Sequence, residues 1–183
     1  EEVVQPYLQD LRDKTGDSAS LAVLSDLDIL YLVHVSTTRM IRLVAGFGTR
    51  FPAYATSLGR ALLAYQPRPR IDDYLQRVEL EKLTAKTVTS KAQLRKILTA
   101  CKKNGFASVQ DELDYGIVSV AVPVFGTDGT ILAAINCSTA TTRVTRDEMV
   151  ATRLPELHEA ANKIEVELRR YPILAHSIRS AAS

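Results

Sequence analysis

The chain of 183 residues has little cysteine, no tryptophan and almost balanced charge. Its two cysteines, Cys101 and Cys137, form no CxxC pair and have no histidine nearby, so the sequence supports neither a disulfide framework nor a zinc site. The net charge is only +2 and no long basic run occurs, which argues against nucleic-acid binding by this chain alone. No apolar run approaches the roughly 18 residues of a membrane span, and the first residues are not signal-like. These absences predict a cytoplasmic protein without a membrane segment, metal or cofactor.

What is present suits one globular domain, with 46% apolar and 24% charged residues. Residues 2–14 show the apolar spacing of a helix that is already under way where the chain starts. We therefore expect residues 1–15 to be a linker helix whose N-terminal neighbour is missing. Gly16 suits the end of this helix.

The strands are expected in two hairpins. Apolar runs at 21–24 and 29–35 surround a polar turn, and runs at 117–125 and 130–138 surround the turn GTDG. Residues 39–45 and 106–110 are expected to add further strands. Because no regular alternation of strand and helix occurs, the sequence predicts an α/β fold of the α+β kind, with a mostly antiparallel sheet flanked by helices.

Helices are expected at 57–65, 71–83, 91–104 and about 146–170. Ser90 with Gln93 and Thr145 with Glu148 have the spacing of capping boxes, in which each side chain bonds the other residue's backbone amide. Pro155 is expected to kink the last helix. Residues 172–183 are expected to form a flexible tail.

The stretch FPAYATSLGRALLAY, residues 51–65, has several possible roles. It matches neither the phosphate-loop spacing nor GxSxG, and no histidine is an evident base for a Ser57 nucleophile. What remains is a helix start, capped by Thr56 or Ser57, with the free amides of Ser57, Leu58 and Gly59 pointing outward. Such an end can bind an anion, or it can be a plain cap with water on those amides.

Ser119, Asn136 and Ser138 lie within otherwise apolar strands. Asn136 and Ser138 share one face by period-two counting, and Ser119 belongs to the partner strand. If that face is buried, these groups must satisfy one another or line a cavity for a polar ligand; alternatively, the face is solvated. The acidic run DELDYG, residues 111–116, fits neither a calcium loop nor a carboxylate pair for catalysis, and we expect it to be a solvated turn.

The motifs FPAYATSLGRALLAY, GFASVQDELDYGIVSVAVPVFGTDGTILAAINCS and RVTRDEMVATRLPELHEAANKIEVELRR, taken in this order, resemble the effector-binding domain of the IclR family of bacterial transcription regulators. The resemblance covers about residues 3–170. It implies a GAF-like domain over residues 16–171, joined by the N-terminal helix to a winged helix-turn-helix that binds DNA as a dimer or tetramer. The form of the first motif is most similar to regulators of aromatic-acid breakdown through the β-ketoadipate pathway.

The resemblance also implies a ligand pocket. Its positions match the helix start Ser57, Leu58 and Gly59 together with Ser119, Asn136 and Ser138. Tyr54 and Arg60 stand where histidine and lysine are common in the family, and CSTA replaces a frequent small-Gly-Pro turn. We therefore expect a sensor of a small organic acid, and no catalysis. The alternatives are an enzyme with Ser57 or Cys137 as nucleophile, and an oligomerisation module with a closed core and no ligand.

Overall fold

The computed structural model describes residues 2–37 and 45–182. Six antiparallel strands form one sheet in the order β3-β2-β1-β6-β5-β4. The elements in chain order are α1 (Gln5–Thr15), β1 (Ser18–Ser25), β2 (Asp28–Val35), β3 (Arg50–Pro52), the 3-10 turn η1 (Ala53–Ala55), α2 (Ser57–Ala64), α3 (Arg68–Arg77), α4 (Lys91–Asn104), β4 (Ala107–Gln110), β5 (Ile117–Phe125), β6 (Ile131–Ala140), α5 (Arg146–Arg170) and α6 (Pro172–Ala181). The prediction of an α+β fold with an antiparallel sheet is confirmed.

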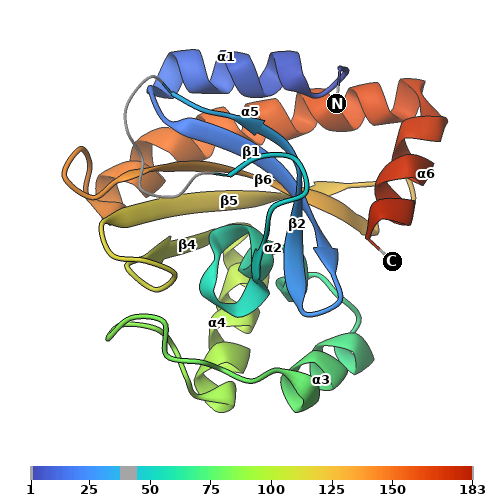
Figure 1. Ribbon diagram of the computed structural model, residues 1–183. Coiled ribbons are helices and arrows are strands. Elements are labelled where there is room, and N and C mark those ends of the chain that lie inside the picture. Colours follow the sequence, from blue (N-terminus) through green and yellow to red (C-terminus); the bar gives the residue numbers. More distant parts are fainter. Residues whose placement is uncertain (1, 38–44, 183) are drawn as a thin grey trace.

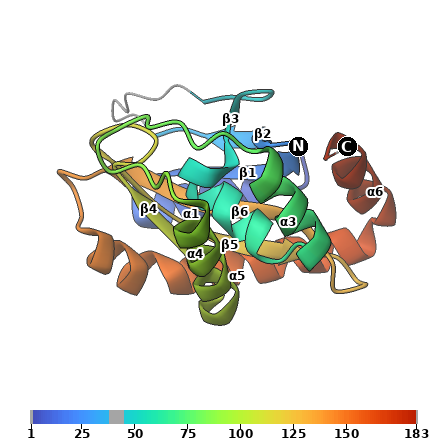
Figure 2. The same ribbon diagram turned by 90° about the horizontal axis from the view of Figure 1, so that it is seen from below.

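Helices cover both faces of this sheet (Figure 1). Helices α1 and α5 lie on one face, and α2, with α4 and α3 outside it, lies on the other; the view from below shows this second layer in front of the strands (Figure 2). The period-two alternation of β5 explains the two layers. Val118, Val120 and Val122 join the core under α1 and α5, whereas Ala121 faces α2.

Small side chains on the α2 face allow the helix to approach the strands closely. Ala22, Ala121 and Ala134 are fully buried there, next to Leu58 and Leu62 of α2. The other face carries larger β-branched residues, which fill the space beneath the long helix α5. The sheet therefore has a bulky apolar side and a side of small residues that leaves room for polar groups.

The helix ends follow the sequence signals in most places. Thr145 and Glu148 form a complete capping box at α5. At α4 the structure shows one half of the expected box, in which the Ser90 hydroxyl accepts from the Gln93 amide at 3.2 Å. Gly16 and Gly105 end α1 and α4 in the left-handed conformation, with φ of 72° and 82°.

The strand expected at 39–45 lies almost entirely outside the described residues. The flexible tail expected at 172–183 is instead helix α6 over most of its length. Ile178 of α6 is buried in the core under α5, and Arg179 pairs with Asp128 in the β5–β6 turn at 3.0 Å. The apolar side of α6 thus covers the end of the sheet.

Candidate functional site

The start of α2 is set by Thr56, whose extended backbone (φ −122°, ψ 148°) makes it the N-cap. Its hydroxyl accepts a hydrogen bond from the Gly59 amide at 3.0 Å, and its carbonyl accepts from the Arg60 amide at 3.1 Å. Of the three amides expected to be free, Gly59 is therefore already bonded. Among the described residues, the amides of Ser57 and Leu58 have no acceptor.

Close packing explains why position 59 is a glycine. A Cβ atom at this position would lie 2.1 Å from the carbonyl oxygen of Ala53 and 2.4 Å from its Cα atom. Only glycine therefore lets the first turn of α2 rest directly on η1. This close approach fixes the direction in which the helix start points.

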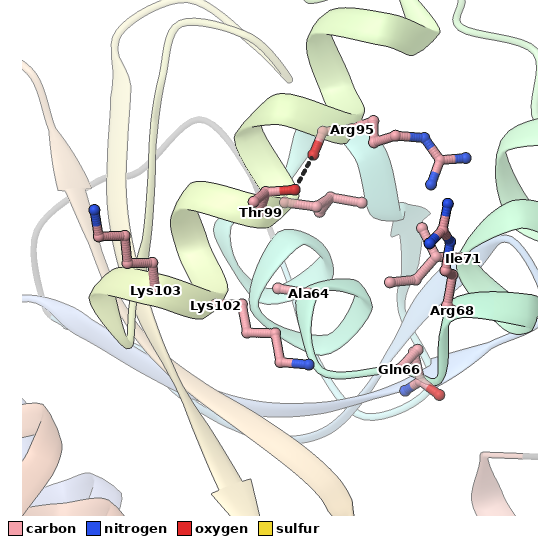
Figure 3. A pocket seen from close by; sticks show the side chains of 9 residues that line it. Ala64, Gln66, Arg68, Ile71, Arg95, Thr99, Lys102 and Lys103 are labelled. Atoms are coloured by element: carbon pink, nitrogen blue, oxygen red, sulfur yellow. Dashed lines mark hydrogen bonds between the residues drawn. The ribbon is translucent and has the colours of Figure 1, made fainter.

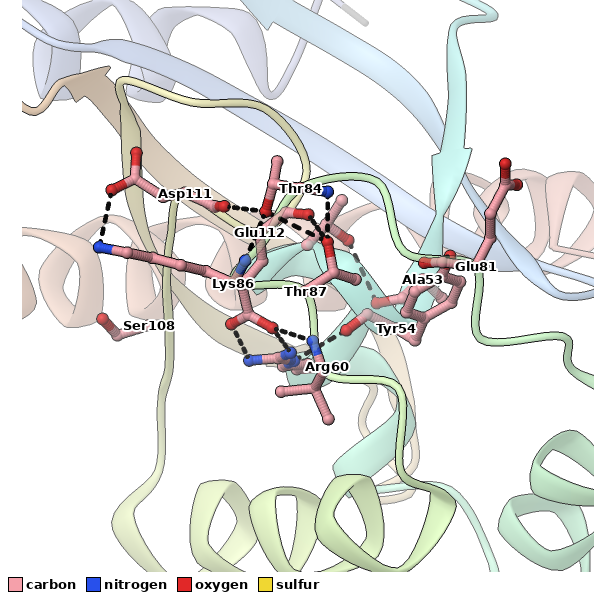
Figure 4. Close-up of polar contacts among 12 residues, drawn as sticks. Ala53, Tyr54, Arg60, Glu81, Thr84, Lys86, Thr87, Ser108, Asp111 and Glu112 are labelled. Atoms are coloured by element: carbon pink, nitrogen blue, oxygen red, sulfur yellow. Dashed lines mark hydrogen bonds and ion pairs between the residues drawn. The ribbon is translucent and has the colours of Figure 1, made fainter.

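A buried ion pair holds the same turn from the other side (Figure 4). The guanidinium of Arg60 donates to both carboxylate oxygens of Glu112, at 2.9 and 2.6 Å, and its Nε donates to the Tyr54 carbonyl at 2.9 Å. Glu112 also accepts from the Val88 amide at 3.1 Å. The side chains of Arg60 and Glu112 are 2% and 8% exposed. The expectation of a solvated acidic turn is therefore wrong for Glu112, because a cation from α2 neutralises it inside the protein.

The Arg60–Glu112 pair also places α2 relative to the sheet. Glu112 belongs to the loop that leaves β4 at Gln110 and enters β5 at Ile117. Ser119 follows only two residues into β5. The first turn of α2 is therefore tied to the end of the sheet where Ser119 lies.

Polar residues form two rows across this end of the sheet. In one row Ser138 of β6 lies opposite both Ser18 of β1 and Ser119 of β5. In the next row Asn136 lies opposite Ser20, which in turn lies opposite His34 of β2. Directly opposed residues of an antiparallel sheet share a face. This face is the α2 side, since alternate residues of the same strands pack with α2.

The two rows are mostly removed from solvent. Ser119 is 9% exposed and Asn136 4% exposed, and Ser138 is half-buried. The alternative of a solvated face is therefore wrong for Ser119 and Asn136. The structure thus places Ser57, Leu58 and Gly59 over the same side of the sheet that carries Ser119, Asn136 and Ser138.

Three buried polar atoms on this side lack a hydrogen-bond partner among the described residues: Ser57 Oγ, Ser18 Oγ and Asn136 Oδ1. A fourth such atom is the hydroxyl of Tyr74 on α3. Leaving a buried donor or acceptor unsatisfied costs about 1–3 kcal/mol. A closed apolar core would not contain this arrangement without a compensating role, whereas a small polar molecule could satisfy these atoms.

Sequence reasoning missed Ser18, Ser20 and His34. The Ser20 hydroxyl lies 2.8 Å from Nδ1 of His34, and burial lowers the pKa of His34 from its ordinary value of 6.5. The alternation of Ser18 and Ser20 with Ala19 and Leu21 was a usable signal, since it repeats the pattern of Asn136 and Ser138. The pairing with His34, by contrast, depends on strand register.

Aromatic rings adjoin the polar rows. Tyr31 packs edge-to-face against His34, with ring centroids 6.1 Å apart, and against Phe51 at 5.7 Å. Burial raises the pKa of Tyr31 to about 12, so its hydroxyl stays protonated at neutral pH. The polar rows are therefore bordered by flat apolar surfaces, which suit an aromatic ring.

The side chains of Arg50 and Tyr54 are engaged elsewhere. Arg50 donates to the Ser25 hydroxyl and carbonyl at 3.1 and 3.0 Å and pairs with Asp28 at 3.3 Å. The Tyr54 hydroxyl donates to the Glu81 carbonyl at 2.8 Å. Arg50 is thus directed to the β1–β2 hairpin, and Tyr54 ties η1 to the segment after α3.

Cys137 and Ser57, the nucleophiles of the enzyme alternative, lie in different surroundings. Cys137 is fully buried in the core under α1 and α5, on the face opposite to Ser57, and burial raises the pKa of its thiol. The Ser57 hydroxyl contacts no base among the described residues. In the same part of the chain no group of three or more metal-binding side chains is found, and no helix is long and apolar enough to cross a membrane.

Known proteins are similar to this chain in fold and in sequence. The family model described as "Bacterial transcriptional regulator IclR C-terminal" matches residues 1–166. The Pca regulon regulatory protein of Pseudomonas putida is 37% identical over 161 residues, which cover 87% of this chain and 55% of that protein. The chain thus spans little more than half the length of this relative.

Solved structures agree with the family match. A transcriptional regulator from Rhodococcus sp. RHA1 is 36% identical, with a TM-score of 0.89 over 92% of this chain and 69% of that chain. An IclR homologue from Microbacterium hydrocarbonoxydans, in complex with 4-hydroxybenzoate, is 25% identical, with a TM-score of 0.83 over 92% of this chain and 68% of that one. The chain therefore belongs to the family of bacterial transcriptional regulator IclR C-terminal domains.

Proposed function

We propose that this chain is the small-molecule sensing domain of a DNA-binding transcription regulator, and that its effector is a small organic acid with an aromatic ring. The observation that carries the proposal is the set of buried, unpartnered atoms on the α2 face, Ser57 Oγ, Ser18 Oγ and Asn136 Oδ1. A ligand would supply the hydrogen bonds that the protein does not.

The carboxylate of the effector is assigned to the helix start. The free amides of Ser57 and Leu58 carry the partial positive charge of a helix N-terminus, which favours an anion. The buried hydroxyl of Ser57, a residue that is 1% exposed, adds a third donor beside them. Gly59 contributes through its close packing on Ala53, since its amide is bonded to Thr56.

The other end of the effector is assigned to the polar rows. Ser119, Asn136 and Ser138 can bond a hydroxyl or a second acid group, and Ser20 with His34 extends the same row. The rings of Tyr31 and Phe51 suit an aromatic acid. The 4-hydroxybenzoate bound by the homologue from Microbacterium hydrocarbonoxydans supports this class of ligand.

Sensing requires no chemistry at the ligand. A ligand that binds one arrangement of subunits better shifts the population toward it, and a coupling of about 1–3 kcal/mol changes DNA occupancy several-fold or more. The DNA-binding part would precede α1 in the full protein, which would act in the cytoplasm as a homodimer or homotetramer. The enzyme alternative is not favoured, because the Ser57 hydroxyl contacts no base among the described residues.

A thermal-shift screen tests the proposal. The 183-residue chain is heated with benzoate, 3- and 4-hydroxybenzoate, short aliphatic acids and uncharged benzyl alcohol. A ligand at about 100 times its Kd stabilises the native state by about 2.7 kcal/mol, which raises Tm by several degrees. We expect aromatic carboxylates to raise Tm and benzyl alcohol not to.

Two variants assign the site. Ser57→Leu should abolish the shift, because it removes the hydroxyl donor and places a larger side chain beside the free amides of Ser57 and Leu58. Ser177→Leu, a matched change on the exposed surface of α6, should keep it. No shift with any acid would favour a closed oligomerisation module, and conversion of an acid to product would favour an enzyme.

A further inference from the structure

Two adjoining hollows lie at the C-terminal end of α2, between the start of α3 and the end of α4, and the second also reaches Leu24 of β1 and Leu132 of β6. Their volumes are about 540 and 680 Å³, and both are lined by Gln66, Arg68 and Lys102. The first is drawn in Figure 3, where side chains from α2, α3 and α4 surround it. The second extends to the β5–β6 turn and to α6. Each has the size of a small-molecule site.

The charges around these hollows are all positive. Arg68 and Arg70 come from the start of α3, and Lys102 and Lys103 from the end of α4. No carboxylate is among the described residues that line either hollow. The chain as a whole has a net charge of only +2, so this concentration is local.

Ion pairs leave most of this charge uncompensated. Two other arginines of the lining are paired, Arg95 with Asp72 and Arg179 with Asp128. For Arg68, Arg70, Lys102 and Lys103, no acidic partner lies within ion-pair distance in the described part of the chain. Arg68 and Lys102, which line both hollows, thus have no acidic partner in the described part of the chain, and Arg70 adds a further cation to the second hollow.

The charges at the start of α3 are also unfavourable for a helix. Cations are unfavourable in the first turn, where the helix dipole is positive, and acidic residues are favoured. The first turn of α3 contains Arg68 and Arg70 and no acidic residue. Departures from local rules are expected at functional or strained sites. An anion between Arg68 and Lys102 would compensate the unpaired cations, and the positive start of α3 would also favour it.

We propose that these hollows form a second ligand site, distinct from the effector site, for a small anion that carries at least two phosphate groups. The guanidinium groups of Arg68 and Arg70 can each bond phosphate through two N–H groups, and Lys102 adds a point charge. Leu62 and Leu98 supply apolar walls for an organic part of the ligand.

Calorimetric titration of the 183-residue chain with inorganic tripolyphosphate tests this site, with acetate as the monovalent control. We expect saturable binding of tripolyphosphate that weakens with added salt, and no saturable binding of acetate. The double variant Arg68→Ala/Lys102→Ala should weaken binding by about tenfold or more, since two charge-assisted contacts are lost.

Two controls make the result specific. Lys82→Ala/Lys96→Ala removes the same charge from exposed lysines outside the hollows and should change the affinity less than about twofold. Ser57→Leu should leave tripolyphosphate binding intact, so failure here is separable from failure of the effector site. The proposal would be overturned if both double variants lost the same affinity or if tripolyphosphate showed no saturable binding. It would also be overturned if a short DNA duplex bound the same place equally well and displaced tripolyphosphate.

Discussion

Arg60 and Glu112 stand 52 residues apart in the chain and form a buried, two-bond ion pair at 2.9 and 2.6 Å. The pair joins the first turn of α2 to the loop between β4 and β5. Glu112 uses the same carboxylate to accept from the Val88 amide, so three segments meet at one acidic group. The orientation of the helix start over the polar rows therefore depends on this contact.

Breaking the pair from one side should be costly. Glu112→Gln leaves the Arg60 guanidinium buried without its counter-charge, and we expect the free energy of unfolding to fall by about 3–5 kcal/mol. Urea denaturation measures this loss. Asp72→Asn is the matched control, because the Arg95–Asp72 pair is exposed, and should cost about 1 kcal/mol or less. Equal effects of the two variants would contradict the structural role of the buried pair.

The contact between Gly59 and Ala53 gives a second prediction. Gly59→Ala places a methyl group where the Ala53 carbonyl already lies, so α2 or η1 must shift. We expect a loss of about 1–3 kcal/mol or more in the free energy of unfolding, together with weaker binding of aromatic acids. Gly46→Ala is the control, since nothing lies within 4 Å of the added atom. A stable Gly59→Ala protein with unchanged ligand binding would show that the close contact is not required.

The His34 environment predicts a pH dependence. Burial lowers the pKa of His34 below its ordinary 6.5, so below about pH 6.5 the unfolded chain binds this proton more readily than the folded chain. The free energy of unfolding should therefore fall as the pH decreases through this range. His34→Gln keeps a hydrogen-bonding group beside Ser20 and should make the stability less sensitive to acid.

Chemical denaturation at pH 7.5 and pH 5.5 measures this effect. His158→Gln, at an exposed position on α5, controls for the loss of one imidazole. If the His34→Gln protein loses as much stability between the two pH values as the parent chain, His34 does not carry the effect.

Much of the fold and part of the site could be predicted from local sequence. Thr56 at the start of α2, the box of Thr145 with Glu148, and the alternation around Ser119 and Asn136 all depend on residues close in the chain. The Ser20–His34 contact depends on strand register, which includes a bulge beside Leu21 and Ala22. Period-two counting along one strand does not reveal this register.

The misjudged segments have a different cause. Glu112 lies in an acidic run that looks solvated, and only the distant Arg60 makes its burial possible. The end of the chain has few strong helix signals, yet Ile178 of α6 packs into the apolar core under α5. Both outcomes were decided by tertiary contacts between residues far apart in sequence.

The last prediction separates a ligand site from a structural core. Ser57→Ala removes a buried hydroxyl that has no partner among the described residues. The chain without ligand should therefore become more stable, by about 1 kcal/mol, since the desolvation cost of the hydroxyl disappears. The stabilisation by aromatic acids should decrease in the same variant, because a donor to the carboxylate is lost. Higher stability with weaker binding is the pattern expected of a residue kept for a ligand.

Ser20→Ala is the contrasting change. Its hydroxyl is bonded to Nδ1 of His34 at 2.8 Å, so its removal takes this hydrogen bond from the partly buried imidazole and should lower the stability of the ligand-free chain. Denaturation curves with and without ligand compare the two variants directly. A loss of stability in Ser57→Ala similar to that in Ser20→Ala would mean that the Ser57 hydroxyl is satisfied within the protein. The assignment of the effector carboxylate to the start of α2 would then lose its main support.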